Sequence, residues 1–154
     1  MYASEFRIIL EAHYPIVAEL YQGPFDFANY PHNLAERNFI LWNSSHGLPG
    51  EHWRIIYIHN NSLDIFDPLG LSEQKIKQWN LKFENEIIVA FNVNQIQPNS
   101  SASCGWFCLY FAIHRVLNPD LSMRQLLNED FSRNPDTNLK IIRTFFSQDG
   151  IHVP

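Results

Sequence analysis

The feature that most constrains the fold is a long apolar segment, Cys104–Leu117, which includes Phe107, Cys108 and Phe111. A polar stretch, Gln97–Ser103, precedes it and cannot continue a strand. Asn118-Pro119 follows it, and proline cannot extend a helix because it lacks the backbone N–H. The segment therefore predicts an apolar helix that begins at Cys104.

Two short runs upstream have the composition of β-strands. Trp53–Ile58 and Leu63–Phe66 are rich in β-branched and aromatic residues, and the turn-prone Asn60-Asn61-Ser62 lies between them. This pattern predicts a β-hairpin with His52 and Asp67 at its open ends. Partners at matching ends of antiparallel strands are about 5 Å apart, so an imidazole is expected beside a carboxylate. A surface salt bridge explains the same pair equally well.

Local signals predict the remaining elements. A helix over Glu5–Tyr21 should be interrupted at Pro15 and ended by Gly23-Pro24, because proline breaks helical hydrogen bonding. The other expected elements are a helix over Leu34–Trp42 capped by Asn33, a helix over Ser72–Trp79, a buried strand over Glu86–Val93, and two short helices, one capped by Ser122 with Gln125 and one over Asn138–Phe146.

The composition restricts the classes of protein to consider. With 154 residues, 45% hydrophobic and 18% charged, we expect residues 1–154 to form one folded domain. The formal charge of -5 and the lack of a Lys/Arg cluster argue against nucleic acid as a partner. No apolar stretch approaches the roughly 20 residues of a membrane span, so we expect no membrane and an intracellular location. The two cysteines, Cys104 and Cys108, are expected to be thiols.

Cys104 is the candidate nucleophile. A helix N-terminus favours the thiolate through its partial positive charge, and the thiolate is the reactive form of cysteine. Gly105 leaves room for a substrate backbone and exposes amide donors. His52 beside Asp67 would supply a base oriented by a carboxylate, as in nucleophilic triads. A cysteine at the start of an apolar helix is nevertheless more often a core residue.

Three strings carry a resemblance to a known family. Gly50-Glu51-His52-Trp53, then Phe66-Asp67-Pro68-Leu69-Gly70, then Gln97-Pro98-Asn99-Ser100-Ser101-Ala102-Ser103-Cys104-Gly105-Trp106-Phe107-Cys108 closely resemble the adenovirus protease family, adenain. The order His, acid, Gln, Cys is that of this family, whereas papain-like enzymes run Cys, His, Asn. The resemblance implies His52 as general base, Asp67 as acid, Gln97 and the Cys104 amide as the oxyanion hole, and Cys104 as nucleophile.

The resemblance also implies a fold and an activity. The expected fold is α+β and papain-like or adenain-like, with a central, largely antiparallel sheet packed against the helix that carries Cys104. The expected activity is that of a cysteine endopeptidase that processes viral precursor proteins, in a host cell or virion. Asp67 replaces the family's Glu, and no cysteine between Asp67 and Gln97 could tether an activating peptide by a disulfide. Activation by a peptide that is not covalently tethered stays an open alternative.

Other functions use the same residues. The same triad could serve a deconjugating protease acting on SUMO or ubiquitin-like tails, and Trp53 beside the histidine fits the wider clan that includes SUMO-specific proteases. Acyl transfer to a partner or a non-catalytic binding module on the same fold are further alternatives. Cys104, Cys108 and His114 lack a fourth ligand for zinc, so neither a metal nor another cofactor is expected.

Overall fold

A five-stranded sheet lies at the centre of the computed structural model, which describes residues 1–43, 52–84, 88–99 and 102–154. The strands are arranged in their sequence order, and the described residues form β1 (Tyr21–Asp26), β2 (Phe39–Asn43), β3 (Trp53–His59), β4 (Ser62–Phe66) and β5 (Ile88–Phe91). The pairs β2–β3 and β3–β4 are antiparallel, whereas β1–β2 and β4–β5 are parallel. The α+β class is confirmed, but the sheet is mixed and not largely antiparallel.

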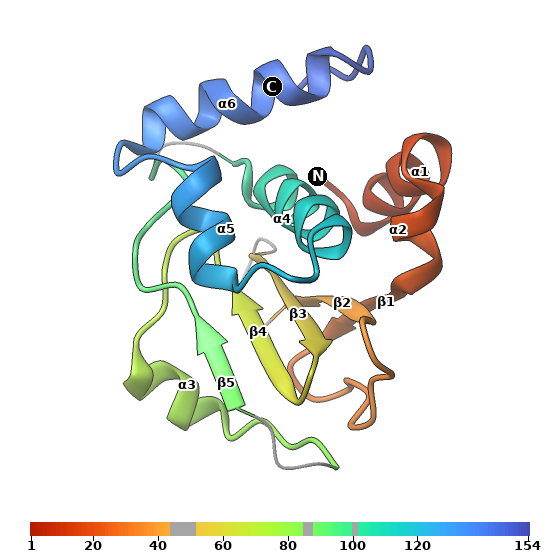
Figure 1. Cartoon of the computed structure of the whole chain (residues 1–154), viewed down its shortest axis with the longest axis vertical. Helices are drawn as coiled ribbons and strands as arrows, with labels where there is room; N and C mark the ends of the chain where they lie inside the picture. The colour runs from red at the N-terminus through yellow and green to blue at the C-terminus, as the bar shows by residue number, and fades with distance from the viewer. Residues whose placement is uncertain (44–51, 85–87, 100–101) are drawn as a thin grey trace.

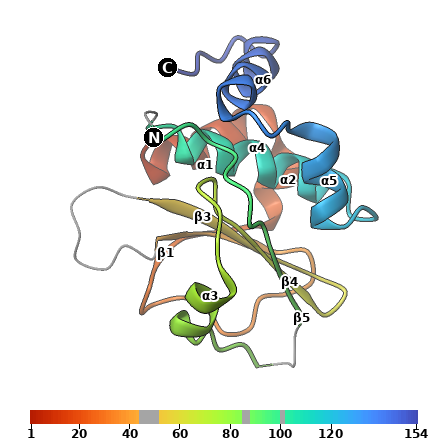
Figure 2. The same ribbon diagram turned by 90° about the vertical axis from the view of Figure 1, so that its left-hand side faces the viewer.

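Helices cover both faces of this sheet. The described residues form α1 (Ala3–His13), α2 (Pro15–Leu20), α3 (Glu73–Trp79), α4 (Cys104–Leu117), α5 (Met123–Asp130) and α6 (Pro135–Ser147). As Figures 1 and 2 show, α4 lies on one face with the other long helices around it, and α3 lies on the opposite face. Within the described part of the chain, no helix is long and apolar enough to cross a bilayer.

Several predicted elements are confirmed. The hairpin β3–β4 turns at Asn60 and Asn61, both with positive φ, and α4 begins at Cys104. The predicted break in the first helix falls at Tyr14, between α1 and α2. Ser122 caps α5 with the predicted capping box. The predicted strand over 86–93 is seen as β5, and residues 44–51, 85–87 and 100–101 lie outside the described part of the chain.

The predicted helix over Leu34–Trp42 is wrong, because its second half is the strand β2. Phe39 and Leu41 belong to the core cluster that includes α4, whereas Ile40 and Trp42 belong to the cluster on the other face. This alternation with period two is the burial pattern of a strand with both faces covered. The capping pattern at Asn33 is a weak local signal, and burial on two faces overrides it.

The strand β1 was also missed, since Gly23-Pro24 looked only like a helix stop. β1 is an edge strand. Proline, which lacks a backbone N–H, is tolerated there because no neighbouring strand on the outer side requires a donor. Gly23 has φ +111°, and the register of β1 with β2 shifts between Tyr21 and Pro24. The edge position therefore explains how a breaker sequence can pair in parallel with β2.

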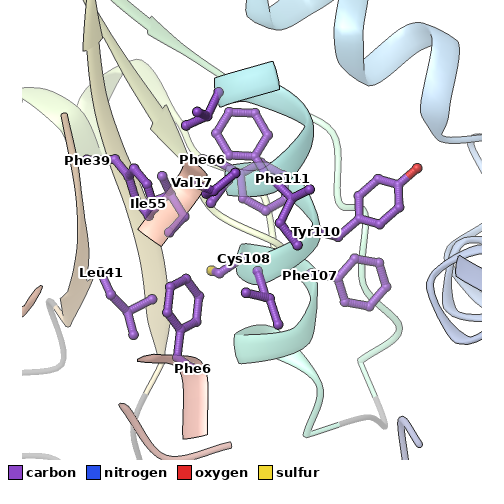
Figure 3. Packing of buried hydrophobic residues seen from close by; sticks show 14 of the residues in the cluster. Phe6, Val17, Phe39, Leu41, Ile55, Phe66, Phe107, Cys108, Tyr110 and Phe111 are labelled. Carbon is purple, nitrogen blue, oxygen red and sulfur yellow. The ribbon is translucent and has the colours of Figure 1, made fainter. Parts of the chain in front are cut away.

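The main core lies between α4 and the sheet. Figure 3 shows Cys108 and Phe111 on the side of α4 that faces the strands, whereas Phe107 lies on the other side of the helix, beside Tyr110. Phe107 packs there against Phe131, with ring centroids 5.9 Å apart. The rings of Phe66 and Phe111 stack with centroids 4.4 Å apart. This packing fixes the first turn of α4 against the end of the β3–β4 hairpin, which is where the candidate site lies.

Candidate active site

The first residue of α4 meets the open end of the β3–β4 hairpin. The Cys104 side chain is hydrogen-bonded to His52, and His52 Nε2 is 2.7 Å from Asp67 Oδ1. Cys104 is partly buried, His52 is about one-fifth exposed, and Asp67 is buried. Three residues that are far apart in the sequence thus form one hydrogen-bonded series of thiol, imidazole and carboxylate.

The Asp67 carboxylate accepts hydrogen bonds from three donors. Oδ1 accepts from His52 and from the Leu69 amide at 2.8 Å, and Oδ2 accepts from Arg54 Nε at 2.6 Å. Burial alone would raise the pKa of Asp67, but the bond from His52, the Arg54 charge and the Leu69 amide outweigh it, and the pKa is lowered. The group therefore stays ionised although it is only 1% exposed.

The backbone around Asp67 is held as firmly as its side chain. The Asp67 N–H donates to Asn92 Oδ1 at 3.0 Å, and Asn92 Nδ2 donates to the Asp67 carbonyl at 2.7 Å. Gly70, with φ +84°, donates its N–H to the same carbonyl, and a Cβ at that position would lie 2.4 Å from the Val93 carbonyl oxygen. Glycine is thus required at the turn that follows the carboxylate.

The two cysteines differ in their electrostatic surroundings. Burial would raise the pKa of Cys104, but the hydrogen bonds with His52 and the Trp53 backbone, together with the His52 charge, lower it. The pKa of Cys108 is raised well above its ordinary value, first by full burial and then by the Cys104 charge. The Cys108 thiol instead donates to the Trp53 carbonyl at 3.2 Å. Only Cys104 is thus set for nucleophilic chemistry.

The pKa of His52 is raised. Burial of the ring acts in the opposite direction, but the hydrogen bonds with Asp67 and Cys104 and the Asp67 charge outweigh it, and the Arg54 charge opposes them in part. A raised pKa on the imidazole and a lowered pKa on the thiol both favour a thiolate–imidazolium pair. That pair is the reactive state of an activated cysteine.

Gln97 lies in the same corner through its backbone. The amides of Ile96 and Gln97 both donate to the Pro68 carbonyl, at 2.8 and 2.9 Å, so this segment is tied to the residue that follows Asp67. Gln97 is buried, and Gln95 Nε2 donates to its carbonyl. These contacts fix the Gln97 backbone beside Pro68, the residue that follows Asp67.

The strand register explains how the hairpin assembles the pair. Ile55 pairs with Phe66, so the next position sets Arg54 opposite Asp67, and both lie on the face that contacts α3. The expectation that His52 faces Asp67 directly is wrong in this detail. His52 lies two residues before Arg54, the residue opposite Asp67, and directly before Trp53, where β3 begins, so its position is not set by the strand pairing.

Sequence reasoning missed Arg54 and Asn92. The signal for Arg54 was its charge inside a strand that is otherwise apolar and aromatic, because a buried arginine requires an anionic partner. Asn92 gave a weaker signal, a polar residue directly after the predicted buried strand. Among the described residues, no group of three His, Cys, Asp or Glu side chains could hold a metal ion.

Comparison with known proteins adds no further constraint. No protein-family profile matches the chain, and no curated protein matches it at a significant level. The geometry of the site and the motifs themselves therefore carry the functional argument.

Proposed function

We propose that this protein is a cysteine endopeptidase with an adenain-like fold, in which Cys104, His52 and Asp67 form the catalytic triad. The observation that carries the proposal is the hydrogen-bonded series from Cys104 through His52 to Asp67 at the start of α4. The helix start, the lowered pKa of the thiol and the buried, ionised carboxylate all support nucleophilic catalysis.

The first half of the mechanism forms an acyl-enzyme. The Cys104 thiolate attacks the carbonyl carbon of a peptide bond, and the charge that develops on the carbonyl oxygen is stabilised by the Gln97 side-chain amide and the Cys104 backbone N–H. The His52 imidazolium then gives its proton to the leaving nitrogen, the C–N bond breaks, and a thioester to Cys104 remains.

The second half releases the acid. His52, now neutral, accepts a proton from a water molecule whose oxygen attacks the thioester carbonyl. The C–S bond breaks, the acid product leaves, and the thiolate–imidazolium pair is restored. Asp67 keeps the ring oriented throughout and stabilises its protonated form without itself accepting the proton. The resemblance to adenain makes a viral precursor protein the proposed substrate.

Turnover of quenched-fluorescence peptides by the triad variants tests this proposal. Cys104→Ala and His52→Ala should abolish cleavage, because each removes a reacting group, and Asp67→Asn should leave reduced but measurable cleavage. Cys108→Ala is the matched control, one helical turn away and fully buried, and should retain wild-type kcat. Full activity of His52→Ala would overturn the mechanism.

A second reporter separates endopeptidase from deconjugating activity. A ubiquitin-like protein with a Gly-Gly tail, joined through that tail to a fluorophore, should be cleaved poorly relative to internal peptide bonds. Efficient cleavage of the tail alone would replace the endopeptidase proposal with deconjugation by the same triad.

A further inference from the structure

Arg54 is a buried cation behind the candidate acid. It is 4% exposed, in a strand whose other members are apolar, aromatic or at the strand end, and its Nε donates to Asp67 Oδ2 at 2.6 Å. Its guanidinium lies over the Trp79 ring of α3, 4.8 Å from the ring centroid. Arg54 is thus fixed from two sides, by a carboxylate and by an aromatic face.

The two oxygens of Asp67 are therefore divided between two cations. Oδ1 faces the imidazole and Oδ2 faces the guanidinium, so the carboxylate plane cannot turn without losing one of them. The titratable or charged groups around the Asp67 carboxylate are His52 and Arg54 from the β3 segment, Cys104 and Cys108 from α4, and the amino group of Met1. The Leu69 amide is a neutral donor to the carboxylate, and the neutral Asn92 side chain bonds to the Asp67 backbone.

We propose that Arg54 is a positioning residue that locks the Asp67 carboxylate toward His52 and limits how tightly that carboxylate holds the imidazolium. The inference rests on the proposed function. Because Arg54 shares the negative charge of Asp67, it sets the pH at which His52 loses its proton and, with it, the upper pH limit of activity.

The direction of the effect follows from the charges. The Arg54 charge acts to lower the pKa of His52, and the Asp67 charge acts to raise it. Without the guanidinium, the full charge of Asp67 would act on the imidazolium, and the pKa of His52 would rise further. The pKa of His52 should rise by roughly half a unit or more in the absence of Arg54. This is less than the 1–3 units that a charge in direct contact produces.

The molecule provides a matched control on the opposite face of the same hairpin. Arg115 of α4 donates from Nε to Asp64 Oδ2 at 2.6 Å, lies 4.8 Å from the Tyr57 ring centroid, and is equally buried at 4% exposure. The Arg115–Asp64 pair has the same chemistry and burial as the Arg54–Asp67 pair, but no hydrogen bond joins it to His52. Its loss should therefore destabilise the fold without changing the pKa of His52.

The experiment is an NMR titration of the His52 ring in the full chain, assigned by the signal lost in His52→Gln. Arg54→Met should raise the pKa of His52 by roughly half a unit or more and move the upper limb of the kcat/KM profile to higher pH. Arg115→Met should leave both values at wild type. Equal shifts in the two variants, or none in either, would overturn the inference.

A second variant tests geometry and remains informative where Arg54→Met does not fold. Arg54→Lys keeps the positive charge but loses the planar guanidinium and its Nε donor, so the pKa of His52 should stay within a few tenths of wild type while kcat falls about tenfold or more. Wild-type kcat in Arg54→Lys would contradict the positioning role. The titration needs no substrate, so it reads the Arg54 effect even where peptide cleavage, and with it the proposed function, fails.

Discussion

At the scale of single residues, the site depends on how the hydrogen bonds to Asp67 are distributed among its neighbours. The backbone of Asp67 is held by Asn92, one oxygen is held by Arg54, and the other is left to orient His52. A buried acid without such donors would be protonated and could not stabilise an imidazolium. The hydrogen-bond donors around Asp67 thus keep its carboxyl group ionised, which allows it to orient His52.

Gln97 allows a test of transition-state stabilisation apart from nucleophile activation. A donor aimed at a developing oxyanion contributes little before attack, because that charge does not yet exist. Gln97→Ala should lower kcat on a peptide by about 10²- to 10³-fold, the usual cost of one lost oxyanion donor. Alkylation of Cys104 by iodoacetamide, which forms no tetrahedral oxyanion, should stay within a few-fold of wild type.

The control for this prediction is the comparison of the two rates in the same variant. A parallel loss of both rates would mean that Gln97 only holds the segment on the Pro68 carbonyl. No change in either rate would remove Gln97 from the mechanism.

At the scale of elements, the turn of the β3–β4 hairpin sets the register on which the site depends. Asn60 and Asn61 have φ of +50° and +59°, the left-handed pair that a two-residue hairpin turn requires. The resulting register places Arg54 opposite Asp67. Asn61 is exposed, so a substitution there acts through the backbone.

Substitution at Asn61 should therefore change stability according to backbone freedom. Asn61→Ala should lower the free energy of unfolding by about 1 kcal/mol, since a Cβ without a polar group disfavours the left-handed region. Asn61→Gly should stay at or above wild-type stability. Urea unfolding of the two variants measures the difference, and an Ala variant as stable as the Gly variant would rule out this account of the turn.

Elements with strong local signals could be predicted from the sequence, and those decided by distant partners could not. Pro15, the Asn60-Asn61 turn, the Ser122 cap and Asn118-Pro119 each act within a few residues, so the elements beside them were predicted correctly. β1 and β2 are strands because neighbouring strands and two core clusters cover them, and no local residue encodes that burial.

The candidate site divides in the same way. His52, Asp67, Gln97 and Cys104 were found because they lie in motifs with recognisable spacing. Arg54 and Asn92 were missed because their roles depend on the strand register and on a contact with a segment 25 residues away, neither of which the sequence displays.

At the scale of the whole molecule, both faces of the sheet contain a buried Arg–Asp pair, so folding buries charge on each side of the β3–β4 hairpin. Such pairs make stability depend on pH because the pKa of each carboxyl group differs between the folded and the unfolded chain. Asp67 has a lowered pKa in the folded state, whereas burial raises the pKa of Asp64. As the pH falls, Asp67 and Asp64 therefore change the free energy of unfolding in opposite directions.

The Asp67 contribution can be isolated by difference. Since its folded pKa is depressed, the stability that it contributes is present above the unfolded value of about 3.9 and is lost as the pH falls through the folded value. The difference in unfolding free energy between wild type and Asp67→Asn should be constant between about pH 5 and 6, where His52 is protonated in both the folded and the unfolded chain, and should shrink below about pH 4. A difference that does not change down to pH 3 would contradict the lowered pKa.

The rate of Cys104 alkylation as a function of pH tests the central claim, that His52 and the start of α4 activate this thiol. An ordinary thiol with a pKa near 8.5 loses about tenfold in rate per pH unit below that value, so its rate at pH 6 would be roughly 100-fold lower than at pH 8. Wild-type Cys104 should instead react with iodoacetamide at pH 6 within a few-fold of its rate at pH 8, and His52→Ala should shift the pH dependence toward that of an ordinary thiol. The labelled residue is mapped by mass spectrometry, with Cys108 expected to stay unlabelled. A wild-type Cys104 that follows the ordinary thiol curve, or that matches its own rate in His52→Ala, would contradict the account.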